Sequence, residues 1–373
     1  MKVSKKQLGL YLHVPFCLQK CGYCNFYSVT DLTFISRFVD CLCEQISLQK
    51  RLFDLMGFEV DSIYFGGGTP SLLNATQFDR ILNEIYKTFF VSPVVEVSLE
   101  CNPCNLTFQF LSDLKLLQFN RLSVGIQSAV DSELRLLGRV HSFYQASRGC
   151  SIAFDVGFSN ISADLIVGLP GQTFKSLAYS LTSLSKLPLT HLSLYILKIE
   201  PGTRFASTRF FNLPDNDMQA VFYETASDFF QRKGFSHYEI SNFALPDFEC
   251  VHNLKYWTLQ DYLGFGPGAH SFFGNHRFFV KPDMMLFLNH CFDTRLELPF
   301  STITKEEWLM LRLRLKQPVL FSELIDHGFN LSFLKFKLQQ LACAHLINLT
   351  STGFYMTSKG FLLQNRVFLF LTT

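Results

Sequence analysis

Across residues 1–200 one pattern occurs six times: a short apolar run typical of a β-strand, then a longer segment with apolar residues at helical spacing, recurring at roughly 30 residues. The first run covers residues 8–14, and the helical segment after it covers about residues 32–56. Further strands are predicted at residues 62–65, 94–100, 121–127, 162–167 and 191–199. Such βα units place their strands in one parallel sheet. The chain is therefore predicted to be an α/β protein with a partial (β/α)6 barrel, and a doubly wound sheet is the alternative.

The repeating pattern ends near residue 200, and two further parts are predicted beyond it. Residues 201–300 are rich in aromatic residues, glycine and proline and predict an α+β extension. Residues 301–373 contain helical patterns at 305–315 and 331–344, followed by a short hairpin pattern. We therefore predict a core barrel over residues 1–200, an extension over 201–300 and a winged-helix-like C-terminal domain over 301–373.

Composition and charge exclude several classes of function. Lys and Arg number 33 against 31 Asp and Glu, so there is no basic excess for nucleic-acid binding. No run of about 18 uncharged apolar residues occurs, so membrane contact is expected to be at most peripheral. The N-terminus is basic and then apolar but lacks a small-residue cleavage site. We expect a cytoplasmic protein, in which the 11 cysteines are thiols or metal ligands rather than a disulfide framework.

Three cysteines lie close together directly after the first predicted strand. Cys17, Cys21 and Cys24 form a C-x3-C-x2-C motif. Three thiolates can hold one [4Fe–4S] cluster and leave the fourth iron open to a small molecule. Zinc is the competing metal, but a closed zinc site needs a fourth Cys or His, and Cys101 and Cys104 have no second pair near them in the sequence. The C-terminal end of a barrel strand is also where barrel enzymes place their chemistry.

The cysteine motif, with an aromatic residue before its last cysteine, resembles that of the radical S-adenosylmethionine (SAM) superfamily. Further motifs resemble one branch of it, the oxygen-independent coproporphyrinogen III oxidase-like proteins, and follow that branch's order. They are YLHVPFC (11–17), YFGGGTPS (64–71), ECNP (100–103), SVGIQS (123–128), LGRVH (137–141), DLIVGLPGQT (164–173) and IEPGT (199–203). The resemblance covers nearly the whole chain and implies a radical SAM barrel with a [4Fe–4S] cluster and SAM as cofactors.

The resemblance also implies which residues surround SAM. In this branch the amino and carboxylate groups of SAM chelate the open iron. The glycines at 66–68 allow close approach of the backbone, and Gly67, Gly68 and Thr69 are candidates for the methionine end, with an ordinary tight turn as the alternative. Glu100 ends an apolar strand, where its carboxylate can bind a ribose or an amine. The other candidates are Tyr11, Tyr23, Gln127, Arg139 and Asp164.

Asp164 has a structural alternative to ligand binding. It lies in the apolar run ISADLIVGLP, where a carboxylate needs either a ligand or a partner. An ion pair with Arg139 or Arg121 would satisfy that need without SAM.

Two activities occur in this branch, and two features separate them. The oxidases have a fourth cysteine two residues after the third, where this chain has Phe26. The Cys-x-Phe form and the segment HNLKYW (252–257) resemble the HemW group, whose members bind heme and act as heme chaperones. An imidazole can ligate heme iron, so His252 is the candidate heme contact, with His237 and His270 as alternatives. A purely structural histidine is an equal alternative at this position.

These features together favour a heme chaperone that binds a [4Fe–4S] cluster, SAM and heme and delivers heme to respiratory proteins. The alternative is an oxygen-independent coproporphyrinogen III oxidase, a radical SAM decarboxylase of porphyrin biosynthesis. A purely structural iron–sulfur or zinc protein is a third, more distant reading. The sequence leaves open whether SAM is cleaved, and hence whether the protein is an enzyme, and whether it forms a homodimer.

Overall fold

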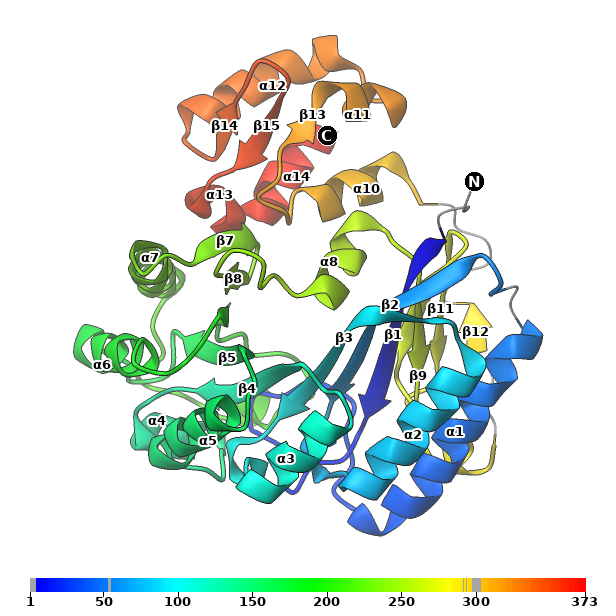
Figure 1. Cartoon of the computed structure of the whole chain (residues 1–373). Coiled ribbons are helices and arrows are strands. Elements are labelled where there is room, and N and C mark those ends of the chain that lie inside the picture. Colours follow the sequence, from blue (N-terminus) through cyan, green and yellow to red (C-terminus); the bar gives the residue numbers. More distant parts are fainter. Residues whose placement is uncertain (1–4, 53–54, 291, 293, 297–302) are drawn as a thin grey trace.

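The computed structural model describes residues 5–52, 55–290, 292, 294–296 and 303–373. At its centre, six parallel strands lie side by side in chain order within a twelve-stranded sheet (Figure 1). They are β1 (Lys6–Val14), β2 (Phe58–Gly67), β3 (Val91–Cys101), β4 (Arg121–Gln127), β5 (Asn160–Val167) and β6 (His191–Ile196). A doubly wound sheet would reverse its strand order at one point, and this order does not reverse. The predicted partial barrel is therefore confirmed.

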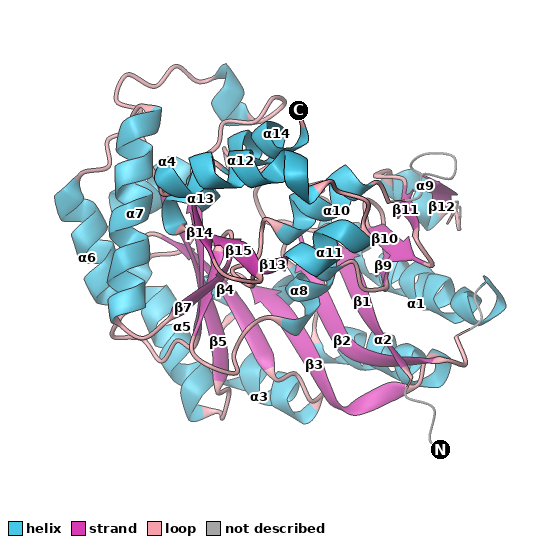
Figure 2. Ribbon diagram, turned by 90° about the horizontal axis from the view of Figure 1, so that it is seen from above, coloured by secondary structure: helices cyan, strands magenta, loops and turns pink. Residues whose placement is uncertain are grey.

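Helices connect these strands and lie around their outer side (Figure 2). They are α1 (Ile35–Leu52), α2 (Ala75–Thr88), α3 (Phe108–Leu116), α4 (Asp131–Leu137), α5 (Phe143–Asp155) and α6 (Phe174–Leu184). Short 3-10 helices occur at η1 (Leu32–Phe34), η2 (Pro70–Leu72), η3 (Pro103–Asn105) and η4 (Arg204–Ser207). Local sequence explains α2 well: Asn74 and Gln77 form a capping box at its start, and Phe78, Ile81 and Ile85 recur at helical spacing and are buried.

The segment after β6 adds strands to both edges of the same sheet. Strands β7 (Ser236–Glu239) and β8 (Asn242–Ala244) pair antiparallel beyond β6. At the other edge, β9 (Tyr262–Phe265) pairs parallel with β1, and β10 (His270–Phe273), β11 (His276–Val280) and β12 (Thr294–Leu296) follow. The helices of this segment are α7 (Asn216–Arg232), α8 (Val251–Thr258) and α9 (Met284–Leu288). The predicted extension thus continues the sheet of the barrel.

The C-terminal part has its own small sheet, of order β13-β15-β14, and its own apolar core. Its elements are α10 (Lys305–Arg312), β13 (Val319–Leu320), α11 (Phe321–Asp326), α12 (Leu331–Cys343), β14 (Ile347–Leu349), β15 (Gly353–Met356), α13 (Ser358–Leu362) and α14 (Gln364–Thr372). The predicted helices and hairpin are therefore present, while the domain boundaries at 200 and 300 remain predictions. Within the described part of the chain, no helix combines the length and the apolar character needed to cross a membrane.

The C-terminal part joins the barrel where β7 ends. Glu239 forms an isolated antiparallel bridge with Leu315, and the Ile240 amide donates a hydrogen bond to the Arg314 carbonyl (2.8 Å). The side chain of Glu239 is fully buried at this joint, and burial raises its pKa to about 7. The folded protein therefore favours the neutral form of this carboxyl group.

We predict that Glu239 makes the stability of the fold depend on pH. Because the pKa of Glu239 is higher in the folded protein than in the unfolded chain, its contribution is complete below about pH 4.5 and is lost as the pH rises through about 7. In urea titrations, the unfolding free energy should change less between about pH 5 and pH 8 in Glu239→Gln than in wild type. The two changes should differ by on the order of 1–3 kcal/mol. Asp228→Asn, at an exposed position on α7, is the control. Equal pH dependence of wild type and Glu239→Gln would contradict the prediction.

Candidate functional site

A cavity of about 390 Å³ opens at the C-terminal ends of the barrel strands. The ends of β2, β3, β4 and β6, part of β5, and the loop after β1 contribute to its wall. Most of the predicted site residues line it: Cys17, Cys21, Tyr23, Cys24, Gly67, Gly68, Thr69, Glu100, Gln127, Arg139 and Asp164. Tyr11 and His252, which are far apart in the sequence, do not line it.

The loop that carries the cysteines is held from two sides. The Gly22 amide donates to the Leu137 carbonyl (3.2 Å), and the Phe205 amide donates to the Gly22 carbonyl (2.9 Å). A Cβ atom at Gly22 would lie 2.3 Å from the Phe205 ring, so only glycine fits there. Cys21 accepts a weak hydrogen bond from the Arg139 guanidinium (Nη1 to Sγ, 3.6 Å). The loop is therefore anchored in the protein at its centre.

The three thiols of the cysteine loop lie around one cavity. In the part of the chain that is described, every cysteine is a free thiol, and no three His, Cys, Asp or Glu side chains are close enough to ligate one metal ion. In a cuboidal cluster each thiolate binds a different iron, so the three sulfur atoms need not meet at one point. Three free thiols around one cavity therefore match the donor set of a [4Fe–4S] cluster.

The glycine turn at the end of β2 packs tightly against the cysteine loop and β1. Gly67 has a φ of +111°, and a Cβ atom there would lie 2.5 Å from the His13 ring. A Cβ atom at Gly68 would lie 2.7 Å from the Phe16 carbonyl oxygen. Close packing alone therefore explains why both positions are glycine, whether or not a ligand binds there. Their close approach also places the Gly67 amide beside Glu100.

Two buried carboxyl groups face the cavity. Glu100 accepts hydrogen bonds from the Tyr64 hydroxyl and the Gly67 amide, both at 3.0 Å. Burial, with Asp164 nearby, raises the pKa of Glu100 to about 7. Burial also raises the pKa of Asp164, which accepts a hydrogen bond from Ser123 (3.5 Å). Burial therefore favours the neutral form of both carboxyl groups unless a polar or positively charged ligand in the cavity compensates their charge.

Gln127 and Arg139 complete the polar wall. Gln127 ends β4 with a φ of +71°, an uncommon conformation for a residue other than glycine. Arg139 donates to the Gly125 carbonyl (Nη2, 2.9 Å), besides Cys21, and these two hydrogen bonds fix the position of its guanidinium. The Gln127 Oε1 and Arg139 Nε atoms are buried without a hydrogen-bond partner. Buried polar atoms normally have one, so these two point to a ligand that supplies it.

Tyr11 and His252 lie behind the cavity wall. The Tyr11 hydroxyl contacts His13 Nδ1 (3.0 Å). The side chain of His252 is fully buried, and both of its ring nitrogens are occupied, by Ser62 Oγ (3.0 Å) and by the Tyr256 hydroxyl (2.9 Å). Ser62 lies five residues before the end of β2, which corresponds to roughly 16 Å along the strand. His252 is therefore deep in the barrel and away from the three thiols.

The sequence interpretation missed three groups of this site: Tyr64, Ser123 and Tyr195. Tyr64 is the hydroxyl donor to Glu100, while Ser123 and Tyr195 line the cavity. Side chains alternate between the two faces of a strand. Counting back by two from Glu100 and from Gln127 would have placed polar residues such as Ser123 on the inner face. That alternation was the available signal.

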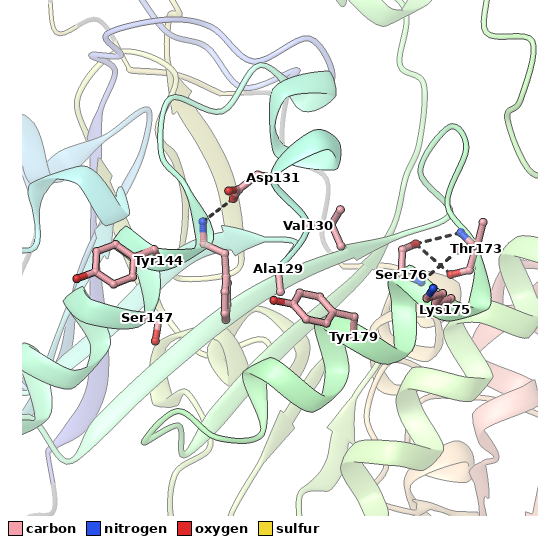
Figure 3. Close-up of a pocket in the computed structure, with 10 residues that line it drawn as sticks. Ala129, Val130, Asp131, Tyr144, Ser147, Thr173, Lys175, Ser176 and Tyr179 are labelled. Carbon is pink, nitrogen blue, oxygen red and sulfur yellow. Dashed lines mark hydrogen bonds between the residues drawn. The ribbon is translucent and has the colours of Figure 1, made fainter.

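A larger hollow of about 740 Å³ lies elsewhere, between the starts of α4, α5 and α6 (Figure 3). None of the predicted site residues lines it. Several of its polar groups bind one another: Asp131 accepts the Phe143 amide (2.9 Å), and Thr173 and Ser176 cap α6 reciprocally. The smaller cavity, with its thiols and its partnerless polar atoms, is therefore the candidate site.

A strand-end cavity with three thiols in a partial barrel is the arrangement of radical SAM proteins, and comparisons with known proteins agree. Residues 11–183 match the Radical SAM superfamily model. The chain is 32% identical to the heme chaperone HemW of Lactococcus lactis over 374 residues, 98% of this chain and 97% of that protein. It is 34% identical to HemW of Bacillus subtilis over 375 residues, 96% and 97% of the two chains.

A solved structure shows the same fold. It is that of coproporphyrinogen III oxidase (HemN) from Escherichia coli, with a TM-score of 0.82 and 24% identity over 99% of this chain and 91% of that one. The chain belongs to the radical SAM superfamily and, within it, to the family of the HemW proteins. The family resemblance seen in the motifs is thereby confirmed. Membership of the superfamily implies a [4Fe–4S] cluster and SAM as cofactors.

We predict that Cys17, Cys21 and Cys24 are each required for cluster binding. Replacing any one with Ala and reconstituting the protein anaerobically with iron and sulfide should abolish the iron–sulfur absorbance, because a missing thiolate exposes a second iron. Cys104→Ala is the matched control, since Cys104 does not line the cavity. The prediction fails if the absorbance survives in a single variant of the three, or if Cys104→Ala also loses it.

Proposed function

We propose that this protein is a cytoplasmic heme chaperone that binds a [4Fe–4S] cluster, SAM and heme and delivers heme to respiratory proteins. The observation that carries the proposal is Phe26. This residue lines the cavity and is 67% exposed, at the position where the resemblance places a fourth cysteine in the oxidases. Full-length similarity to relatives named heme chaperone supports it.

We assign the residues of the cavity wall to two sets, one for each of the two cofactors. Cys17, Cys21 and Cys24 would hold the cluster, and the remaining predicted residues would hold SAM. When bound, these two cofactors supply one-electron chemistry. The chain itself orients them: the Gly67 turn brings a backbone amide and the Glu100 carboxylate together, and Glu100 can accept a hydrogen bond from an amine or a ribose hydroxyl. The partnerless Gln127 and Arg139 atoms can bind the polar groups that remain.

The exposed edge of the cavity has the chemistry that a heme needs. Leu18 and Phe26 line the cavity and are 54% and 67% exposed. Exposed apolar side chains that gather at a cavity often mark a binding site for an apolar ligand. Lys20 and Lys198 line the same cavity and are also exposed. Heme is a flat apolar ring with two carboxylates. The apolar pair can cover part of the ring, and the Lys20 ammonium can bind one carboxylate. The Lys198 ammonium is ion-paired with Glu200 (2.6 Å) and would exchange that partner for the other carboxylate.

We predict that SAM affinity depends on pH through Glu100. The pKa of Glu100 in the ligand-free protein is about 7, so its carboxylate is lost by protonation below that pH. SAM should therefore bind more weakly at about pH 6 than at about pH 8, because the neutral acid is a poorer acceptor. Anaerobic equilibrium dialysis of the reconstituted protein measures this. Glu100→Gln should bind SAM weakly with little pH dependence, whereas Glu84→Gln on the outer helix α2 should follow wild type. A Glu100→Gln profile equal to that of wild type would disprove the assignment.

We predict that the protein binds and transfers heme but does not oxidise coproporphyrinogen III. The reconstituted protein, given SAM, a reductant and coproporphyrinogen III without oxygen, should form no protoporphyrinogen IX. The same protein loaded with heme should transfer it to a heme-depleted b-type cytochrome. Efficient conversion of coproporphyrinogen III would instead establish the oxidase.

The edge of the cavity can be tested in the same heme titration. Phe26→Asp should weaken heme binding about tenfold or more, because it removes apolar contact and places a negative charge beside the ring carboxylates. Phe211→Asp is the matched control: Phe211 is 86% exposed but does not line the cavity. Equal heme affinity in the Phe26 and Phe211 variants would move the heme site elsewhere.

A further inference from the structure

The segment 252–257 forms most of helix α8, which packs between strand β2 and helix α10 (Figure 1). Its first turn is capped by a buried carboxylate from the barrel. Glu96 accepts hydrogen bonds from the Val251 amide (3.1 Å) and the His252 amide (3.2 Å), and from the Cys250 thiol (3.6 Å). A negative group at a helix N-terminus satisfies its free amides and its dipole. The segment is therefore held within the barrel from its first residue.

The imidazole of His252 has no coordination site left for a metal. One ring nitrogen contacts Ser62 and the other contacts Tyr256, at 3.0 and 2.9 Å. The ring is fully buried, and a Cβ atom at Gly9 of β1 would lie only 3.2 Å from it. An axial ligand needs one free nitrogen and space for a porphyrin plane above it. Neither is present around this side chain.

The ring of His252 also packs against a tyrosine that contacts a carboxyl group of the cavity wall. His252 stacks on Tyr64 with ring centres 5.3 Å apart and planes at 26°, and Tyr11 stacks on both. The Tyr64 hydroxyl donates to one oxygen of Glu100 (3.0 Å), whose other oxygen accepts the Gly67 amide (3.0 Å). A continuous set of contacts thus runs from His252 through Tyr64 to the carboxylate at the cavity.

We propose that His252 is a positioning residue of the SAM pocket, which orients Glu100 through Tyr64, and that it is not the axial ligand of heme. The inference rests on the proposed binding of SAM by Glu100. Removing the imidazole leaves a void beside Tyr64 and takes a partner from both Ser62 and Tyr256. Tyr64 then loses the face that fixes its ring, and Glu100 loses an oriented donor.

Three variants of the full-length reconstituted protein test this, with SAM affinity and the heme Soret spectrum as the two readouts. His252→Ala should weaken SAM binding about tenfold, and Tyr64→Phe, which removes only the hydroxyl, should do so to a similar degree. The double variant should bind SAM no more weakly than the weaker single one, because both act on the same contact. The Soret spectrum and heme affinity should match wild type in all three. His345→Ala, at an exposed histidine of the C-terminal part, is the control for the general loss of an imidazole.

Each contrary result has a distinct meaning. Loss or displacement of the Soret band in His252→Ala with normal SAM affinity would make His252 the heme ligand. Normal SAM affinity in a folded His252→Ala variant, or losses that multiply in the double variant, would overturn the positioning role. If His252→Ala does not fold, His252→Gln replaces it: Gln can keep a hydrogen bond but not the ring stack, so its SAM affinity should fall below that of wild type, and a wild-type affinity in folded His252→Gln would overturn the positioning role. Failure of wild type to bind heme would refute the chaperone proposal and leave the SAM comparison valid.

Discussion

The register between β1 and β2 is the constraint on which the site depends. In this parallel pair Val14 lies opposite Gly67, and the Gly68 amide donates to the Val14 carbonyl (2.9 Å). The cysteine loop begins three residues after Val14, so this register alone places the thiols beside the glycine turn. A side chain at Gly67 or Gly68 would collide with the loop or with β1. The tight turn and the position of the three thiols are therefore one structural feature.

The interior of the barrel explains why the pKa values of the two carboxyl groups at the cavity are raised although a buried arginine lies near them. Below them lies a buried polar layer that includes Glu96, Arg121 and His191, all 9% exposed or less. The Arg121 guanidinium tends to lower the pKa of Glu100 and Asp164, but burial outweighs it and raises both. A carboxyl group whose pKa is about 7 can change its charge when a ligand binds, which a surface carboxylate cannot do near neutral pH. Burial thus makes Glu100 responsive to what enters the cavity.

Much of this structure could be predicted from the sequence because it depends on local pattern. Strand β4 begins and ends at the predicted residues 121 and 127, and the motifs after the strands meet at one cavity because parallel strands end at the same edge. The edge strands β7 to β12 were not predicted in detail, since short strands in a segment rich in glycine and aromatic residues have no regular period. The depth of His252 could not be predicted either, because it depends on how α8 enters the barrel.

The helical spacing of the segment 252–257 nevertheless held a sign of its structural role. His252, Lys255 and Tyr256 stand at i, i+3 and i+4 and so share one face of a helix. Lys255 is almost fully buried and pairs with Asp61 (2.7 Å), which is the partner that a buried ammonium group requires. A helix face that buries a lysine and a histidine must satisfy both within the protein, and Tyr256 on the same face is one of the partners of His252. Binding heme iron through His252 would break the contact of one ring nitrogen with Ser62 or Tyr256. The existing contacts therefore favour the positioning role of His252.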